Sequence, residues 1–254
     1  MIILLSPAKT LDLSEKEYLL DTTQSTFRSN AQELITELKK YNKPDLRKLM
    51  SISDALAETN IERYQNFKKI HNRKNSKAAI YTFNGDVYRG LDAESLNKKD
   101  LVYAQDHLRI LSGLYGYIKP MDLIQPYRLE MGSKLKNKKG KNLYEFWDQL
   151  ITKAINKDLK ATNSDLIINL ASNEYFSAVK KDGLKGNVID IHFREYKKDE
   201  LKFVSFTAKV ARGMMSHYII KNKLKKAEDL KGFDYENYSF NEQLSSEHEL
   251  FFVR

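Results

Sequence analysis

Polar residues that follow predicted strands are the first candidates for chemistry in this sequence. Lys9 lies in the segment from Ser6 to Thr10, just after an apolar run at residues 1–5 that predicts a short buried strand. Sites of α/β proteins gather at the carboxyl ends of strands, so Lys9 is a candidate anion ligand and, if desolvated, a candidate nucleophile. The alternative is an ordinary surface lysine after a turn.

Two carboxylates and a basic pair extend this set. Asp86 lies in a predicted tight turn and Glu130 lies among apolar residues close to Arg128, so either carboxylate could act as an acid or a base. Lys209 and Arg212 are three positions apart on a predicted helix, which places them on one face where they could clamp a phosphate. The catalytic candidates are therefore Lys9, Asp86, Glu130 and Lys209. A purely structural Arg128–Glu130 ion pair is the alternative.

The segment at residues 107–120 predicts a helix, a glycine-containing hairpin and the start of a second helix. Gly113 and Gly116 would let backbone amides turn outward and hold a phosphate without reading bases. Arg109 and Lys119 belong to the same segment and are included among the phosphate ligands. The alternative is a simple helix C-cap.

A run of five lysines without an acid follows at residues 134–141, comprising Lys134, Lys136, Lys138, Lys139 and Lys141. Each lysine that reaches a phosphate releases counterions, so this loop would add salt-sensitive affinity that is independent of base sequence. The net charge of +9 agrees with a polyanionic partner. An exposed, solvated loop is the alternative, and a second cluster at residues 221–226 would have to share the same face for the binding hypothesis to gain strength.

Several classes of site have no support in the sequence. The chain has no cysteine, which removes disulfides and thiolate metal sites, and its five histidines are scattered, so we expect no metal site and no cofactor. Phosphate-loop, nucleophile-elbow and dinucleotide fingerprints are missing. No apolar run approaches the roughly 20 residues needed to cross a bilayer, and we expect a cytoplasmic protein.

Strands alternate with helices along the chain, which predicts a mixed α/β fold with a central sheet and surrounding helices. We expect one compact domain over residues 1–254. The expected strands are residues 1–5, 78–83, 165–170, 188–193 and 201–206, and the expected helices are residues 31–41, 53–70, 143–159 and 207–221. Trp147 is expected in the core, and Ser172 is expected to cap a helix.

The chain resembles the YaaA family of bacterial peroxide-stress proteins almost from end to end. The similar segments are residues 6–10, 83–88, 107–116, 125–132, 168–176 and 208–213. The resemblance implies a compact mixed α/β fold with a helix-hairpin-helix element beside a positively charged cleft. It also implies affinity for duplex DNA and a role in limiting damage from unincorporated iron during peroxide stress.

Three functional hypotheses remain open at this point. The first is a double-stranded DNA-binding protein whose phosphate ligands are Lys9, Arg109, Gly113, Gly116, Lys119, Arg128, Lys134, Lys136, Lys138, Lys139, Lys209 and Arg212. The second is an enzyme that acts on a nucleotide or a damaged DNA base in the same cleft. The third, iron binding through Asp, Glu and His, has the weakest support because the histidines are scattered.

Overall fold

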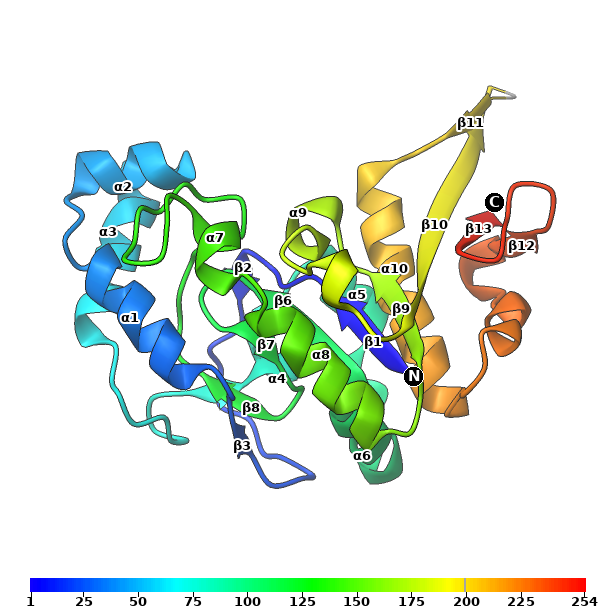
Figure 1. Ribbon diagram of the computed structural model, residues 1–254, viewed down its shortest axis with the longest axis horizontal. Coiled ribbons are helices and arrows are strands. Elements are labelled where there is room, and N and C mark those ends of the chain that lie inside the picture. The colour runs from blue at the N-terminus through cyan, green and yellow to red at the C-terminus, as the bar shows by residue number, and fades with distance from the viewer. Residues whose placement is uncertain (199) are drawn as a thin grey trace.

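Strands that are apolar on both faces form the middle of the sheet. In the computed structural model, which describes residues 1–198 and 200–254, β1 (Ile2–Leu5) and β6 (Leu108–Ser112) are buried at every position. Such strands need cover on both faces and are typical of parallel sheets. The main sheet has the order β12-β13-β10-β9-β1-β6-β7, with β11 added at the end of β10 (Figure 1).

The five central strands are parallel, and the two outermost strands are antiparallel to their neighbours. The remaining strands of the sheet are β7 (Gly116–Ile118), β9 (Leu166–Leu170), β10 (Asn187–Lys197), β11 (Glu200–Lys202), β12 (Ser239–Asn241) and β13 (Glu249–Val253). Ile3 aligns with Leu108 on one side and Ile168 on the other. This register brings the carboxyl ends of β1, β6 and β9 to one edge.

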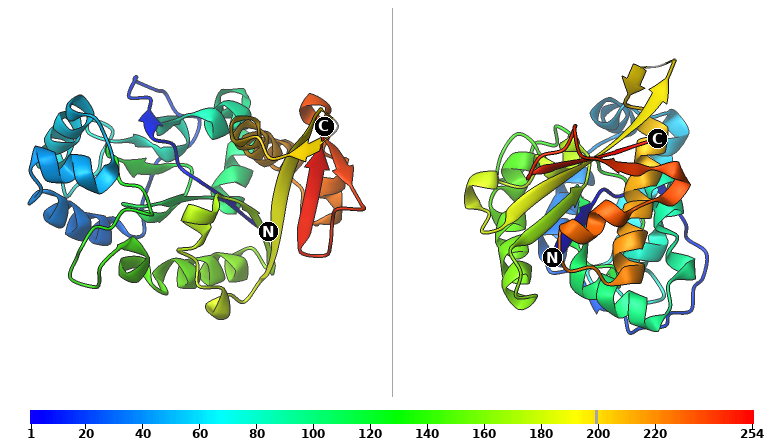
Figure 2. Two further views of the ribbon diagram at one scale, coloured as in Figure 1. Left: turned by 90° about the horizontal axis from the view of Figure 1, so that it is seen from above. Right: turned by 90° about the vertical axis from the view of Figure 1, so that its right-hand side faces the viewer.

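Helices cover both faces of this sheet (Figure 2). One face carries α8 (Leu150–Ala161), and the other carries α10 (Ser205–Asn222) with α5 (Asp86–Leu91) and α6 (Lys98–His107). The short helices α7 (Leu143–Trp147) and α9 (Asn173–Phe176) follow the loops at the carboxyl edge.

A helical region that we call the N-terminal lobe lies to the left in Figure 1. It comprises α1 (Arg28–Leu38), α2 (Lys43–Met50) and α3 (Asp54–Asn66). Two small sheets lie between the lobe and the main sheet. One contains β3 (Thr23–Gln24), β8 (Asp122–Ile124) and β4 (Lys77–Ala78), and the other contains β2 (Thr10–Leu11) and β5 (Phe83–Asn84). The short helix α4 (Ala79–Thr82) connects β4 to β5. One continuous cluster of buried hydrophobic residues joins the lobe to the main sheet.

The mixed α/β fold with a central sheet is confirmed. The strands expected at residues 1–5, 165–170 and 188–193 are present, as are the helices expected at residues 31–41 and 53–70, allowing for shifts at their ends. The Ser53 hydroxyl accepts a hydrogen bond from the Leu56 amide and caps α3, as its sequence position indicates.

The helix-hairpin-helix predicted at residues 107–120 is wrong. After His107 ends α6, the chain forms a β-hairpin, β6 and β7, because Leu108, Ile110 and Leu111 are buried in the sheet. Gly113 packs against the backbone, where a Cβ would lie 2.2 Å from the Leu129 carbonyl oxygen. Gly116 has φ of +68°, so both glycines serve a buried turn and offer no nest to solvent.

Three other segments differ from prediction. Residues 77–84 are not one strand but two short strands around α4. The helix expected at residues 143–159 breaks at Asp148, whose φ is +38°, and becomes α7 and α8; Trp147 is fully buried as expected. The strand expected at residues 201–206 ends at Lys202.

The helix cap expected at Ser172 is not formed. Ser172 precedes α9, but its side chain makes no cap because it lies beside that of Ser6.

Helices α5 and α10 cross in backbone contact through two glycines. A Cβ on Gly90 would lie 2.0 Å from the Val210 carbonyl oxygen, and a Cβ on Gly213 would lie 1.9 Å from the Val87 carbonyl oxygen. Real Cβ atoms do not approach oxygen so closely, and backbone on both sides leaves no side chain that could move away. The crossing therefore requires glycine at both positions.

We predict that Gly90→Ala lowers the free energy of unfolding by about 3 kcal/mol, because the helices must separate to admit the methyl group. Urea unfolding followed by circular dichroism measures this loss. Gly232→Ala is the control: its Cβ would meet only the end of the Tyr218 side chain, at 2.9 Å, and should cost less than about 1 kcal/mol. A Gly90→Ala protein with the midpoint of the wild type would contradict the prediction.

Candidate functional site at the carboxyl edge of the sheet

Polar residues at the carboxyl ends of β1 and β9 connect the loops that follow these strands by hydrogen bonds. The Ser172 amide donates a hydrogen bond of 2.9 Å to the hydroxyl of buried Ser6, and the Tyr88 hydroxyl donates to the Ser6 carbonyl at 3.1 Å. The Asn169 side chain donates to Asp190 at 2.6 Å and accepts from the Ala171 amide at 3.0 Å. These groups are used within the fold, and they fix the loop that carries Lys9.

Glu130 joins the two cations that the sequence places near it. One carboxylate oxygen lies 2.8 Å from Lys9 Nζ and the other lies 2.9 Å from an Arg128 guanidinium nitrogen. Burial lowers the pKa of Arg63 on α3, and the positive charge of Arg128 adds to this effect. Two cations therefore share the Glu130 carboxylate, and Arg63 adds a third positive charge near Arg128.

The catalytic candidates do not form one constellation. Lys9 and Glu130 are in contact, but the carboxylate of Asp86 pairs with Arg89 on its own helix. Lys209 is exposed on α10, and within residues 1–198 and 200–254 it has no ion pair. The Lys9 side chain is 62% exposed, unlike the desolvated amines that act as nucleophiles.

The lysine loop at residues 134–141 presents its charges to solvent. Buried Ser133 and Leu135 alternate with exposed Lys134 and Lys136, so the backbone itself directs the lysines outward. Lys139 is the exception, since its ammonium lies 3.6 Å from Glu33 and over the Phe146 ring. Among the residues that the structure describes, the other four lysines of the loop have no ion pair.

Two further arginines lie close in space across the sheet. Arg212 on α10 is half-buried, and burial together with the positive charge of Arg194 on β10 lowers its pKa. Within the described part of the chain, neither guanidinium pairs with a carboxylate. Arginines held in this way attract an external anion such as a phosphate.

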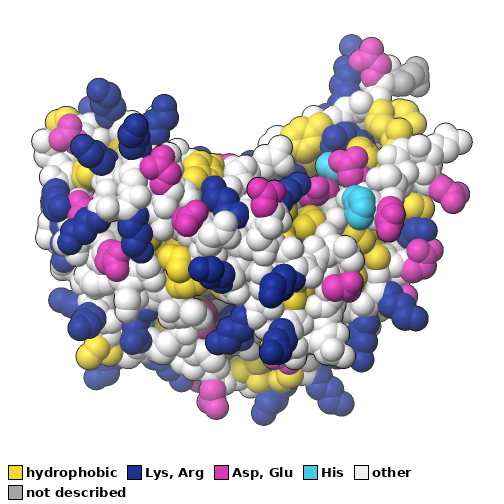
Figure 3. All heavy atoms as spheres, viewed as in Figure 1, with side chains coloured by type: hydrophobic (Ala, Val, Ile, Leu, Met, Phe, Trp, Pro, Cys, Tyr) yellow, Lys and Arg dark blue, Asp and Glu magenta, His cyan; other side chains and the backbone are white. Residues whose placement is uncertain are grey.

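The surface is hollowed between the N-terminal lobe and a projecting arm, residues 194–198 and 200–204, formed by the ends of β10 and β11 (Figure 3). Lys and Arg side chains gather on the lobe and appear on the arm, with a few Asp and Glu between them. We call this surface the hollow. It lies above the loops that follow β1 and β9 (Figure 1).

Some phosphate ligands proposed from the sequence are structural instead. Arg109 is 1% exposed; it pairs with Asp158 at 2.5 Å and donates to three backbone carbonyl oxygens. Lys119 lines a cavity of about 580 Å³ that also includes Met1, at the amino end of β1 and thus at the edge opposite Lys9. Arg109, Gly113, Gly116 and Lys119 are therefore not part of the hollow.

The second lysine cluster also lies at the amino edge. Lys221 and Lys223 pair with buried Asp100 at 3.0 and 2.8 Å, and Lys225 lines the same cavity as Met1. The DNA-binding hypothesis would gain strength if this cluster lay on the same face as the lysine loop, and the structure shows that it does not.

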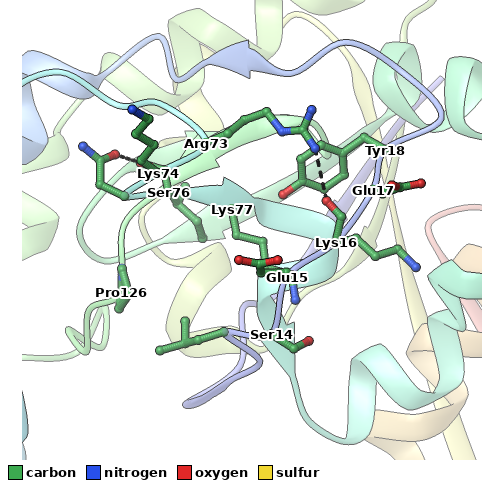
Figure 4. A pocket seen from close by; sticks show the side chains of 13 residues that line it. Ser14, Glu15, Lys16, Glu17, Tyr18, Arg73, Lys74, Ser76, Lys77 and Pro126 are labelled. Carbon is green, nitrogen blue, oxygen red and sulfur yellow. Dashed lines mark hydrogen bonds between the residues drawn. The ribbon is translucent and has the colours of Figure 1, made fainter.

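A separate cavity of about 710 Å³ opens beside Tyr18 (Figure 4). Its cations are largely engaged within the fold: Lys77 lies 3.4 Å from Asp12, and the Arg73 guanidinium lies over the Tyr18 ring and donates to the Lys16 carbonyl at 3.3 Å. Lys9, Arg128 and Glu130 do not line this cavity.

Over residues 1–198 and 200–254, no group of three or more His, Asp or Glu side chains is arranged to hold a metal ion. Among these residues there is also no helix with the length and apolar character needed to span a membrane.

Sequence reasoning missed Arg63 and Arg194. Each lies in an ordinary amphipathic pattern on a helix or a strand, with no motif around it. Their relevance comes from tertiary neighbours, Arg128 and Arg212, that are distant in the chain.

We predict that Asp100 makes stability depend on pH in the acid range. Burial acts to raise the pKa of this carboxyl, but hydrogen bonds from Lys223 and Lys221 outweigh it and lower the pKa to about 2 from an ordinary value of 3.8. A depressed pKa stabilises the fold above about pH 4, and this stabilisation disappears as the pH falls to 2. Asp100→Asn should cost on the order of 2 kcal/mol at pH 7 and progressively less between pH 4 and pH 2.

Urea titrations of wild type and Asp100→Asn at several pH values measure this difference. Asp229→Asn, at an exposed carboxyl, is the control and should cause no such pH-dependent difference. A constant gap between wild type and Asp100→Asn from pH 7 to pH 2 would contradict the assignment.

Comparisons with known proteins agree with the resemblance seen in the sequence. The family model described as "Peroxide stress protein YaaA" matches residues 1–244. A UPF0246 protein of Saccharophagus degradans is 50% identical over 254 residues, covering 100% of this chain and 99% of the relative. Another UPF0246 protein, from Idiomarina loihiensis, is 49% identical over the same length and is covered to 98%. The chain therefore belongs to the YaaA (UPF0246) family of peroxide stress proteins.

Proposed function

We propose that this protein binds double-stranded DNA across the hollow and contacts mainly the phosphate backbone. The observation that carries the proposal is the lysine loop, which precedes α7 beside the N-terminal lobe (Figure 1). Its residues Lys134, Lys136, Lys138 and Lys141 are exposed and have no ion pair in the described part of the chain. Counterion release favours binding of such lysines to closely spaced phosphates.

The two sides of the hollow differ in how they would hold a backbone. The lysine loop is flexible at its side-chain ends and would supply point charges, whereas Arg194 and Arg212 are partly buried and more fixed. Lys209, exposed one turn before Arg212, could reach the same phosphate. The negative charge of Glu130 opposes binding, and it would be tolerated because Lys9 and Arg128 neutralise it.

The peroxide-stress family suggests why a protein would cover DNA phosphates. Iron bound to a phosphate converts peroxide to hydroxyl radical in place, and a protein that occupies the backbone displaces such iron. Limiting iron-dependent oxidative damage to DNA is thus the biological role that we propose, with the cytoplasm as its place. It needs neither a cofactor nor turnover.

A second candidate function is an enzyme that acts on a nucleotide or a damaged DNA base. The contact between Lys9 and Glu130 favours it, because an amine beside a carboxylate is the pair that a base-removing lyase would use. Borohydride trapping with an abasic duplex tests this candidate. An adduct that is lost in Lys9→Ala supports it, and no adduct with the wild type removes it.

We predict that Lys134→Ala/Lys136→Ala weakens duplex binding several-fold at low salt and lowers the slope of log Kd against log salt by up to about 2, since two phosphate contacts are lost. Fluorescence anisotropy with a labelled 20-base-pair duplex measures both quantities. Lys225→Ala/Lys226→Ala is the matched control, because it removes the same charge from exposed residues at the amino edge. Equal losses in both variants would show that net charge alone governs binding and would refute this site.

We predict that Glu130→Gln strengthens duplex binding several-fold, because Lys9 and Arg128 then lose the carboxylate that neutralises them. The same anisotropy assay measures the gain. Glu228→Gln, in an exposed pair with Lys231, is the control and should leave Kd within about twofold. Weaker binding by Glu130→Gln would place the duplex elsewhere.

A further inference from the structure

We propose that Tyr115 and His71 form a redox-active pair, in which Tyr115 gives one electron to a radical oxidant while its hydroxyl proton moves to His71. The oxidants are one-electron acceptors of the kind that iron and peroxide generate. Because the chain has no cysteine, a reversible oxidation site in it cannot be a thiol. The inference goes beyond the proposed DNA binding and does not depend on it.

The two side chains of the pair meet in the core. Tyr115 lies between β6 and β7, His71 follows α3, and both are buried (Figure 1). The Tyr115 hydroxyl oxygen lies 2.9 Å from Nε2 of His71, which is a hydrogen-bond distance. A proton can therefore pass from the phenol to the imidazole without movement of either ring.

The direction of this hydrogen bond follows from the other partners of the two groups. The Gln125 amide donates to the Tyr115 oxygen at 3.0 Å, so the hydroxyl accepts there and still has its own proton to donate. Burial lowers the pKa of His71 to about 4, and a hydrogen bond with the Lys69 backbone opposes this effect only in part. The imidazole is thus neutral at pH 7, and its Nε2 can accept the Tyr115 proton.

Gln125 holds both members of the pair in place. Its backbone amide binds the Tyr115 hydroxyl. Its side-chain oxygen accepts from the Lys68 amide at 2.9 Å, and its side-chain nitrogen donates to the Lys68 carbonyl at 2.7 Å. One buried residue therefore fixes Tyr115 and the segment just before His71, which is the arrangement that a positioned proton acceptor requires.

The electron and the proton of Tyr115 have to leave together. Burial raises the pKa of Tyr115, so no phenolate is present to be oxidised, and an oxidised phenol that keeps its proton is a strong acid. The electron reduces the oxidant, and the proton moves to His71 Nε2, which leaves a neutral phenoxyl radical beside an imidazolium. A small reductant such as ascorbate returns the electron, and the proton then returns from Nε2 to the phenoxyl oxygen.

Neighbouring aromatic rings connect the pair to the carboxyl edge of the sheet. The ring centroids of Tyr115 and Tyr127 are 5.4 Å apart. Phe83 lies 6.4 Å from Tyr127 and 5.3 Å from Tyr88, again between ring centroids. The Tyr88 hydroxyl binds the Ser6 carbonyl at the end of β1. Because electrons pass readily between rings that are so close, an oxidant at the carboxyl edge can oxidise Tyr115 without touching it.

The surroundings of the pair protect a radical once it has formed. Phe67 is buried, and its ring centroid lies 5.3 Å from that of His71 and 6.3 Å from that of Tyr115. A radical on an exposed tyrosine such as Tyr196, which is 59% exposed, can couple with a tyrosine of another molecule. Tyr115 is out of reach of such coupling, so a long lifetime distinguishes its radical from those at the surface.

The first test oxidises the protein with photogenerated tris(bipyridine)ruthenium(III) and detects tyrosyl radicals by electron paramagnetic resonance after freeze-quenching. We expect a long-lived tyrosyl signal from the wild type that disappears on addition of ascorbate. Tyr115→Phe should lose this signal. Tyr196→Phe is the matched control, which removes the hydroxyl of an exposed tyrosine and should keep the signal.

The second test isolates the proton transfer. His71→Gln offers an amide oxygen that can accept the hydrogen bond from Tyr115 but cannot take up the proton, so a purely structural role of His71 would survive this change. We expect the Tyr115 radical to form about tenfold or more slowly in His71→Gln. In the wild type it should form more slowly in heavy water than in ordinary water. His248→Gln, at an exposed histidine, should leave the rate unchanged.

Several outcomes would overturn the inference. A long-lived signal that persists in folded Tyr115→Phe would place the radical elsewhere. Equal rates of radical formation in the wild type and His71→Gln would remove the role of His71 as proton acceptor. Circular dichroism verifies that each variant is folded. If Tyr115→Phe does not fold, the wild type alone decides, because equal rates in heavy and ordinary water would contradict coupled loss of the proton.

Discussion

The burial of β1 on both faces is the constraint on which the rest of the structure depends. Its four apolar residues must be covered by helices and flanked by strands, and the chain supplies those strands from β6 and β9, more than 100 residues away. One consequence is that Ser6 and Ser172, which are 166 positions apart, bind each other. The candidate site is therefore a product of this pairing, and a substitution that loosens β1 would disperse the site as well as weaken the core.

The sequence carries enough information for the sheet but not for every element around it. Continuous apolar runs at β1 and β9 leave few alternatives to a buried strand, so those predictions were confirmed. Residues 107–120 were mistaken for a helix-hairpin-helix because leucine and isoleucine at short spacing fit a helix as well as a buried strand. Whether such a segment forms a helix or a strand depends on the element that packs beside it. For β6 that element is β1, about 100 residues earlier in the chain, and the local sequence pattern does not reveal this pairing.

The same distinction explains which site residues could be found from the sequence. Lys9, Arg128 and Glu130 were identified by type and position, and they do meet. Arg109 is a predicted ligand because it lies in an apolar stretch, but the prediction is wrong: Asp158, a buried carboxylate 49 positions away, pairs with it. The sequence does not indicate Arg63 and Arg194, because each becomes a candidate only through another arginine, Arg128 or Arg212, that the fold brings near it.

The overall charge of +9 is less informative than its distribution over the two ends of the sheet. At the amino edge, buried Asp100 pairs with Lys221 and Lys223, and Asp158 pairs with Arg109, so these three cations stabilise the fold and have little left to offer a ligand. At the carboxyl edge, Glu130 is shared by two cations, and four of the five lysines in the lysine loop have no ion pair in the described residues. A cation that is already paired with a carboxylate gains less by meeting a phosphate, so we propose that a polyanion is attracted mainly to the carboxyl edge. Many lysines in a sequence therefore do not by themselves indicate a binding surface, because the fold uses some of them, such as Lys221 and Lys223, to neutralise a buried carboxylate.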